Sequence, residues 1–123
     1  MRKLLMTAAV LGLLLLGPSA ASAADTAPQS VIHVITVAWK PGTSPAQIQA
    51  ALDGVKDLPS KFNGITRVWT KSIKVQGDKA NAIVMEFANA AALKAYAGSD
   101  AQKEWYKVYM SIRQESTTFD ITN

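Results

Sequence analysis

Two side chains of this 123-residue sequence have the chemistry of acid–base catalysis or ligand binding, and both lie in apolar surroundings. His33 is the one histidine, and its imidazole has an ordinary pKa of about 6.5, which suits proton transfer near neutral pH. Tyr96 carries a phenol that can donate a hydrogen bond to a ligand. A lone histidine in an apolar strand and a tyrosine on a packed helical stripe are more often structural residues. We therefore treat both as candidates only.

The acidic side chains offer a third kind of chemistry. Glu86 lies in an apolar run, and a buried carboxylate needs either a partner or a raised pKa, so it is a candidate general base. We favour a structural ion pair with Arg67 or Lys71, from the same chain or from a second copy. Asp53 and Asp57 lie one helical turn apart and are expected on a solvated surface.

Composition excludes several classes of site. The sequence has no cysteine, which removes disulfides, thiolate metal sites and a thiol nucleophile, and one histidine cannot form a histidine-rich metal site. It also has no glycine-rich phosphate loop and no acidic calcium loop. Without Arg2 and Lys3 the chain has 11 basic and 9 acidic residues, which are scattered. We expect no metal, no cofactor and no nucleic-acid partner.

The first 23 residues have the pattern of a secretory signal peptide. A basic end is followed by a short apolar run, by helix-breaking residues and by the Ala-Ser-Ala sequence of residues 21–23. We predict cleavage after Ala23, a flexible lead-in at 24–30 and one domain at 31–123; an uncleaved anchor is the alternative. The protein is then exported to a periplasm or the medium and has no membrane association after cleavage.

Hydrophobic periodicity places the candidates on elements of a small α+β domain. Alternation predicts strands over 31–39, 65–75, 82–87 and 115–122, with a bulge in the second strand and a hairpin joining the second to the third. Ser44 caps a helix that Pro59 ends. A short helix follows Asn89 and closes at Gly98, and Ser99 begins another in a second capping box.

The buried face of the last helix carries most of the remaining aromatic residues. Ala101, Trp105, Val108 and Ile112 are expected on one stripe, with Tyr109 beside it. A set of four aromatics is expected in the core, or alternatively around an aromatic ligand: Trp69, Trp105, Tyr106 and Tyr109.

This element order predicts a ferredoxin-like fold, in which a four-stranded antiparallel sheet has helices on one face. The first and third strands are nevertheless apolar on both faces, and so short a chain has no further element to cover the second face. We therefore predict a homodimer packed sheet to sheet, with Val34, Val84 and Glu86 in the interface.

Three stretches in this order resemble the stress-responsive dimeric α/β-barrel family, known as Dabb. They are residues 32–40, the strand 83–87 running into the helix 90–96, and the closing Phe119-Asp120. The resemblance implies a ferredoxin-like fold that dimerises into a barrel. It also implies kinship with plant stress proteins and with a cofactor-free polyketide cyclase.

The cyclase members place a tyrosine on the helix after the third strand and a catalytic histidine six residues later. Tyr96 matches that tyrosine, whereas the histidine position is Gln102, which cannot take up and release a proton near neutral pH. This departure argues against cyclase activity, so we lean away from an enzyme.

Three functions remain open. We favour binding of a small apolar or aromatic molecule in a pocket between sheet and helices. The alternatives are a cofactor-free enzyme of the polyketide-cyclase or monooxygenase-like type using His33 and Tyr96, and a structural stress-response protein without a ligand. The residues expected to line the pocket are His33, Ile83, Met85, Tyr96, Gln102 and Trp105.

Overall fold

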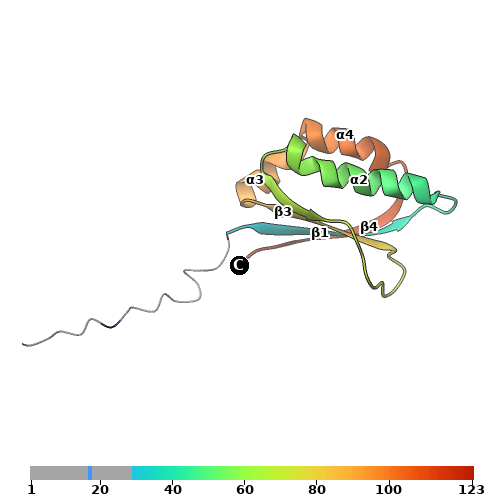
Figure 1. Cartoon of the computed structure of the whole chain (residues 1–123), viewed down its shortest axis with the longest axis horizontal. Coiled ribbons are helices and arrows are strands. Elements are labelled where there is room, and N and C mark those ends of the chain that lie inside the picture. Colours follow the sequence, from blue (N-terminus) through green and yellow to red (C-terminus); the bar gives the residue numbers. More distant parts are fainter. Residues whose placement is uncertain (1–16, 18–28) are drawn as a thin grey trace, which may run out of the picture.

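A computed structural model of the chain describes Gly17 and residues 29–123. Apart from Gly17, the predicted signal peptide lies outside the described residues, as does most of the lead-in. Among the described residues, no helix is long and apolar enough to cross a membrane. The elements follow one another in the order β1 (Val31–Trp39), α2 (Pro45–Lys61), β2 (Ile65–Trp69), β3 (Asn81–Phe87), α3 (Ala90–Tyr96), α4 (Asp100–Tyr109) and β4 (Arg113–Ile121) (Figure 1).

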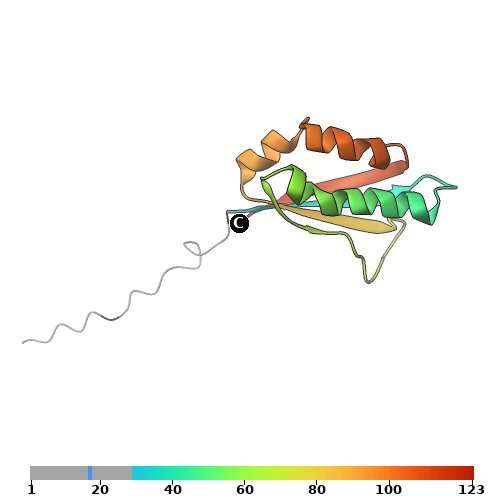
Figure 2. The same ribbon diagram turned by 45° about the horizontal axis from the view of Figure 1, so that its top comes forward.

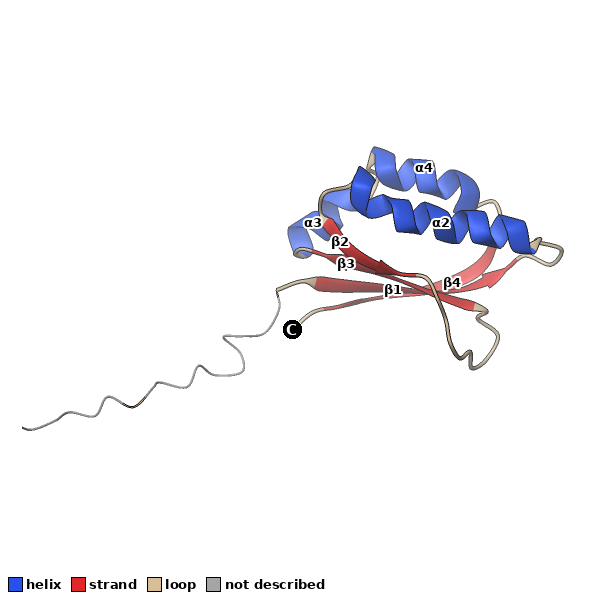
Figure 3. Cartoon of the chain, in the orientation of Figure 1, coloured by secondary structure: helices blue, strands red, loops and turns tan. Residues whose placement is uncertain are grey.

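The strands form one antiparallel sheet in the order β2-β3-β1-β4. Figure 3 shows α2, α3 and α4 together on one side of this sheet. The predicted ferredoxin-like fold with helices on one face is therefore confirmed. Because β1 and β3 lie in the middle of the sheet, their side chains point either into the helix layer or away from it.

The helix α2 begins as predicted and ends later than predicted. Ser44 and Gln47 form a reciprocal capping box, with Gln47 N–H donating to Ser44 Oγ at 3.2 Å and Ser44 N–H donating to Gln47 Oε1 at 2.9 Å. Pro59 lies inside the helix, which continues to Lys61. A proline in the last turn removes one N–H donor, and the helix still closes because Phe62 N–H donates to the Leu58 carbonyl at 2.8 Å.

The second strand is shorter than the alternation predicted. It contains the expected irregularity, a register shift between Ile65 and Arg67, but it ends at Trp69. Beyond this point the chain leaves the sheet. The Ala82 N–H donates to Ser72 Oγ at 3.1 Å, whereas in a continued strand pair it would donate to a backbone carbonyl. The predicted antiparallel pairing of β2 with β3 is confirmed, but residues 70–80 form a long connection between the two strands.

The caps of α3 and α4 lie at the predicted residues, with one difference in the second cap. Asn89 Oδ1 accepts the Ala92 N–H at 2.8 Å, and Ser99 Oγ accepts the Gln102 N–H at 3.2 Å. In a capping box the Gln102 side chain would accept the Ser99 N–H, but here Gln102 Oε1 accepts the Gly98 N–H at 2.7 Å. Gly98 has a φ of +78°, a conformation that favours glycine, and this turns its N–H towards the helix.

The buried stripe of α4 also differs from the prediction. Val108 is 40% exposed, whereas Tyr109 is buried. Ile112 is buried as predicted, although it lies beyond the end of the helix. Tyr109 replaces Val108 because its ring stacks on Trp105, with a centroid distance of 4.4 Å.

The close approach of α2 to α4 depends on a glycine. A Cβ atom placed on Gly54 would lie 2.9 Å from Cδ1 of Trp105. Trp105 has little freedom to move, because its Nε1–H donates to the Ala51 carbonyl at 3.0 Å and its ring stacks on Tyr109. Gly54 therefore sets the distance between the two helices above the sheet.

We predict that Gly54→Val lowers the free energy of unfolding by about 1–3 kcal/mol, the usual cost of overpacking. Thermal or urea unfolding measures this change. Ala46→Val, at an exposed position in the first turn of the same helix, is the matched control and should have a smaller effect. Equal effects of the two substitutions would show that Gly54 does not set the helix spacing.

Candidate functional site

The alternation of β1 divides the sheet into two chemically different faces. Val31, Ile35 and Val37 are buried in the core beneath the helices, and we call their side of the sheet the helix face. The intervening residues, among them Val34 and Thr36, point to the other side, which we call the open face. Each predicted site residue belongs to one of these two faces or to the helices above the first.

His33 lies on the helix face and has a partner that sequence reasoning missed. It is opposite Asp120 in the β1–β4 register, and its Nδ1 lies 2.5 Å from Asp120 Oδ1. The His33 side chain is 16% exposed, and its ring meets the edge of Phe87 at a centroid distance of 5.9 Å. An imidazole held by a carboxylate through Nδ1 has a fixed orientation.

Tyr96 is buried at the same end of the helix face. Its ring packs on Phe62 and Phe87, with centroid distances of 5.5 and 5.3 Å. Its hydroxyl is buried and has no hydrogen-bond partner among the described residues. Burial raises the pKa of Tyr96, and the nearby Tyr106 raises it further, so the phenol stays protonated and can act as a donor. Tyr96 and His33 both contact Phe87.

Gln102 has a structural role in addition to any contact with a ligand. Its Oε1 accepts the Gly98 N–H, and its Nε2 donates to the Tyr106 hydroxyl at 3.1 Å. Both ends of the amide are thus occupied at the start of α4. Tyr106 is 36% exposed, which places this pair at the surface edge of the Tyr96 environment.

The other predicted pocket residues belong to the packed core. Ile83 and Met85 have no exposed surface, and Trp105 is 4% exposed. The predicted set of Trp69, Trp105, Tyr106 and Tyr109 does not form one site. Trp69 is 45% exposed and lies on the open face, opposite Val84. Tyr109 is buried, and this burial raises the pKa of its phenol. A hydrogen bond with Ser116 and the positive charge of Arg113 lower the same pKa by less.

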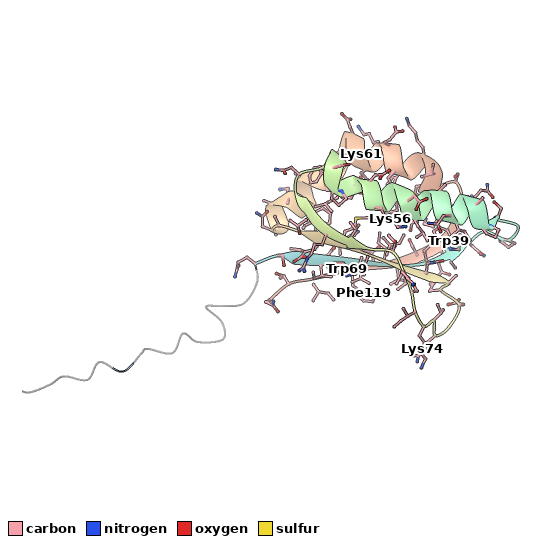
Figure 4. All side chains as sticks on the ribbon, in the orientation of Figure 1. Trp39, Lys56, Lys61, Trp69, Lys74 and Phe119 are labelled. Carbon is pink, nitrogen blue, oxygen red and sulfur yellow. The ribbon has the colours of Figure 1, made fainter. Side chains whose placement is uncertain are left out.

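The open face carries an apolar row across all four strands. Trp69 is paired with Val84, Val84 with Val34, and Val34 with Phe119. Phe119 is 58% exposed, and Ile121, two residues further along β4, is 55% exposed. Figure 4 shows Phe119 on the side of the sheet away from the helices. Large apolar side chains in a continuous row are unusual on an uncovered surface.

Glu86 lies next to this row and has one of its predicted partners. Arg67 Nε donates to Glu86 Oε2 within the same chain, across the β2–β3 pair. This hydrogen bond, followed by one from Ser30, lowers the pKa of the Glu86 carboxyl. The Arg67 guanidinium also lies 5.3 Å from the centre of the Trp69 ring. The pair neutralises charge beside the apolar row.

Acidic groups elsewhere in the described chain do not form a metal centre. No cluster of three or more potential His, Cys, Asp or Glu ligands occurs in residues 29–123. Asp53 is on the solvated surface of α2, as predicted, and accepts hydrogen bonds from Gln49 at 2.8 Å and from Lys56 at 3.2 Å. These bonds lower its pKa.

Comparison with known families confirms the resemblance noted in the sequence. The model described as the stress responsive A/B barrel domain matches residues 31–123. No protein with a curated description matches the chain.

Solved structures share the fold at low sequence identity. The hydroxynitrile lyase of Passiflora edulis is 15% identical, with a TM-score of 0.69 over 78% of this chain and 94% of the other. A Dabb family protein with a ferredoxin-like fold from Mesorhizobium loti is 18% identical, with a TM-score of 0.65 over 76% and 96%. A dimeric ferredoxin-like protein of unknown function from Bacteroides fragilis is 15% identical, with a TM-score of 0.64 over 79% and 99%.

We predict that Arg67→Gln raises the pKa of Glu86 towards its ordinary value of 4.5, as measured by NMR titration of the carboxyl carbon. Because the pKa is lowered in the folded state, the pair stabilises the fold above pH 4.5, and this stability is lost as the pH falls through the lower folded value. The unfolding free energies of the two proteins should therefore converge in acid. Lys107→Gln, which removes the partner of Glu104, is the control and should not affect Glu86. An unchanged Glu86 titration in Arg67→Gln would contradict this assignment.

Proposed function

The chain belongs to the stress responsive A/B barrel domain family, and we propose that it is an exported homodimer that binds a small apolar or aromatic molecule between sheet and helices. The helix face supplies the binding site, and the open face supplies the subunit contact. The basic, apolar and Ala-Ser-Ala pattern of residues 1–23 supports export to a periplasm or the medium.

The Tyr96 hydroxyl is the observation that carries the binding proposal. A buried hydroxyl without a partner costs about 1–3 kcal/mol, so a ligand that accepts its hydrogen bond gains that energy on binding. The surrounding rings of Phe62 and Phe87 favour an apolar or aromatic body for such a ligand. Phe62 is only partly buried, and displacement of its ring is the entry route that we propose.

One observation favours the enzymatic alternative. The His33–Asp120 pair has the geometry of a base held by an orienting carboxylate, as cofactor-free proton transfer requires. The hydroxynitrile lyase with this fold is an enzyme, although its 15% identity supports only a common architecture. The glutamine at position 102 and the buried, protonated Tyr96 give His33 no second group with which to exchange a proton, so we rank binding first.

The dimer proposal is supported by the apolar row of the open face. A contact with two-fold symmetry between two open faces would cover Val34, Val84 and Phe119 of both copies at once. It would also enclose the Arg67–Glu86 pair, which is already neutralised within each chain. The dimeric description of the Bacteroides fragilis protein is consistent with this arrangement.

We predict that Tyr96→Phe reduces the retention of a small molecule about tenfold or more, because the hydrogen-bond donor to the ligand is lost. Native mass spectrometry of the protein isolated from its own compartment measures retained mass. The free variant should be at least as stable as the wild type, because the unsatisfied hydroxyl is gone. Tyr109→Phe, at a buried tyrosine that stacks on Trp105, is the control and should retain the small molecule.

Two outcomes would overturn this proposal. Equal retention in wild type and Tyr96→Phe would show that the hydroxyl does not contact the ligand, and a bare wild-type dimer would favour the structural alternative. If the wild type turns over a substrate and both His33→Ala and Asp120→Asn lose this activity, the enzymatic alternative is correct and the binding proposal is wrong.

For the dimer, we predict that Phe119→Asp raises the dissociation constant at least tenfold, because a charge would be buried in the apolar contact. Sedimentation velocity over a dilution series measures this constant. Met110→Asp, at an exposed apolar residue after α4, is the matched control and should leave it unchanged. A wild type that sediments as a monomer at micromolar concentration would contradict the proposed dimer.

A further inference from the structure

The connection between β2 and β3 exposes apolar side chains away from the sheet. We call residues 70–80 the arm. Ile73 is 93% exposed and Val75 is 48% exposed, although both would normally seek burial. The proposed function uses neither residue.

The arm lies on the same side of the sheet as the open face. Figures 1 and 2, which differ by a rotation of 45°, both show it descending from the sheet on the side opposite the helices. Figure 4 places Lys74 at its far end, beyond Phe119. A body that packs against the open face therefore also meets the arm.

The arm is held in this position by contacts at its base. Ser72 Oγ accepts the Ala82 N–H, and Lys79 Nζ lies 2.9 Å from Glu115 Oε2. Glu115 is opposite Ala38 in the β1–β4 register and belongs to the open face. The Lys79 side chain is only 19% exposed, so the ion pair ties the base of the arm across the sheet.

A hollow of about 340 Å³ lies between the arm and the open face. The sheet contributes Thr36 and Ala82 to its lining, and the arm contributes Ser72, Val75 and Lys79. The other lining residues, Lys74, Gln76 and Asn81, are polar. A cavity of about 150 Å³ is enough to hold a benzene ring, so this hollow has room for a side chain. It opens on the surface that the proposed dimer would bury.

From these contacts we propose that the arm packs on a second copy of this chain, with Ile73 against the partner sheet and a partner side chain in the hollow beneath. The inference rests on the proposed pairing of open faces. Packed sheets lie about 10 Å apart, and five extended residues span about 16 Å, so each limb of the arm is long enough to reach the partner. Two-fold symmetry gives both copies the same contact.

A second copy suits this surface better than a membrane does. The arm carries Lys71, Lys74 and Lys79, which would favour an anionic lipid surface, but Lys79 is paired with Glu115. A membrane reached by the tip of the arm would also leave the apolar row behind it uncovered. A second open face covers the row and the arm in one contact.

The test uses residues 24–123 carrying Ile73→Asp, with Met110→Asp as the control. Because Ile73 is 93% exposed, the variant should fold normally, as thermal unfolding can verify. We expect its dimer dissociation constant, measured by sedimentation velocity, to rise about a hundredfold or more, since each dimer loses two buried isoleucines. Met110→Asp should leave the constant unchanged.

A second measurement uses the absence of cysteine in the sequence. Ile73→Cys provides one site for an environment-sensitive fluorophore, whose emission should shift to the red as the dimer is diluted apart.

The outcomes separate the arm from the dimer itself. If the wild type and Ile73→Asp form equally tight dimers and the emission does not shift on dilution, the arm proposal is wrong and the pairing of open faces stands. A monomeric wild type overturns both. Binding of the wild type to phosphatidylglycerol vesicles, lost in Ile73→Asp while the dimer is unchanged, would assign the arm to a membrane and also overturn the proposal.

Discussion

The structure depends on one constraint, a sheet with two apolar faces and a single layer of helices. Neighbouring residues of β1 show this most directly, since Ile35 is buried under the helices while Val34 points the other way. The helix layer covers the first face. The second face keeps an apolar row from Trp69 to Phe119, and its burial requires a further surface.

The two faces differ in the chemistry that they offer. The helix face is packed tightly, with Gly54 allowing α4 to approach α2, and the polar groups of the candidate site are confined to one end. There the Tyr96 hydroxyl is buried without a partner among the described residues, and His33 is oriented by Asp120. On the open face, the Arg67–Glu86 pair lies beside the apolar row, and the Lys79–Glu115 pair lies further along the sheet. The proposed ligand site and the proposed subunit contact therefore occupy opposite sides of one sheet.

Local patterns in the sequence were sufficient to predict the fold class and most element boundaries. Ser44 and Asn89 mark helix starts because capping involves residues three positions apart. The prediction for 70–75 was wrong because alternation cannot show whether a partner strand is available. Asp120 was missed as the partner of His33 because strand register joins residues 87 positions apart, which no local signal encodes.

The most direct test of the uncovered-face constraint is an isotope-filtered NMR experiment on a mixture of labelled and unlabelled chains. Nuclear Overhauser effects between subunits should reach the methyl groups of Val34 and Val84, and the methyl groups of Val55, buried beneath α2, should show none. If Val34 and Val84 show contacts only within their own chain and exchange magnetisation with water, the open face is not covered by a second copy and the central claim is contradicted.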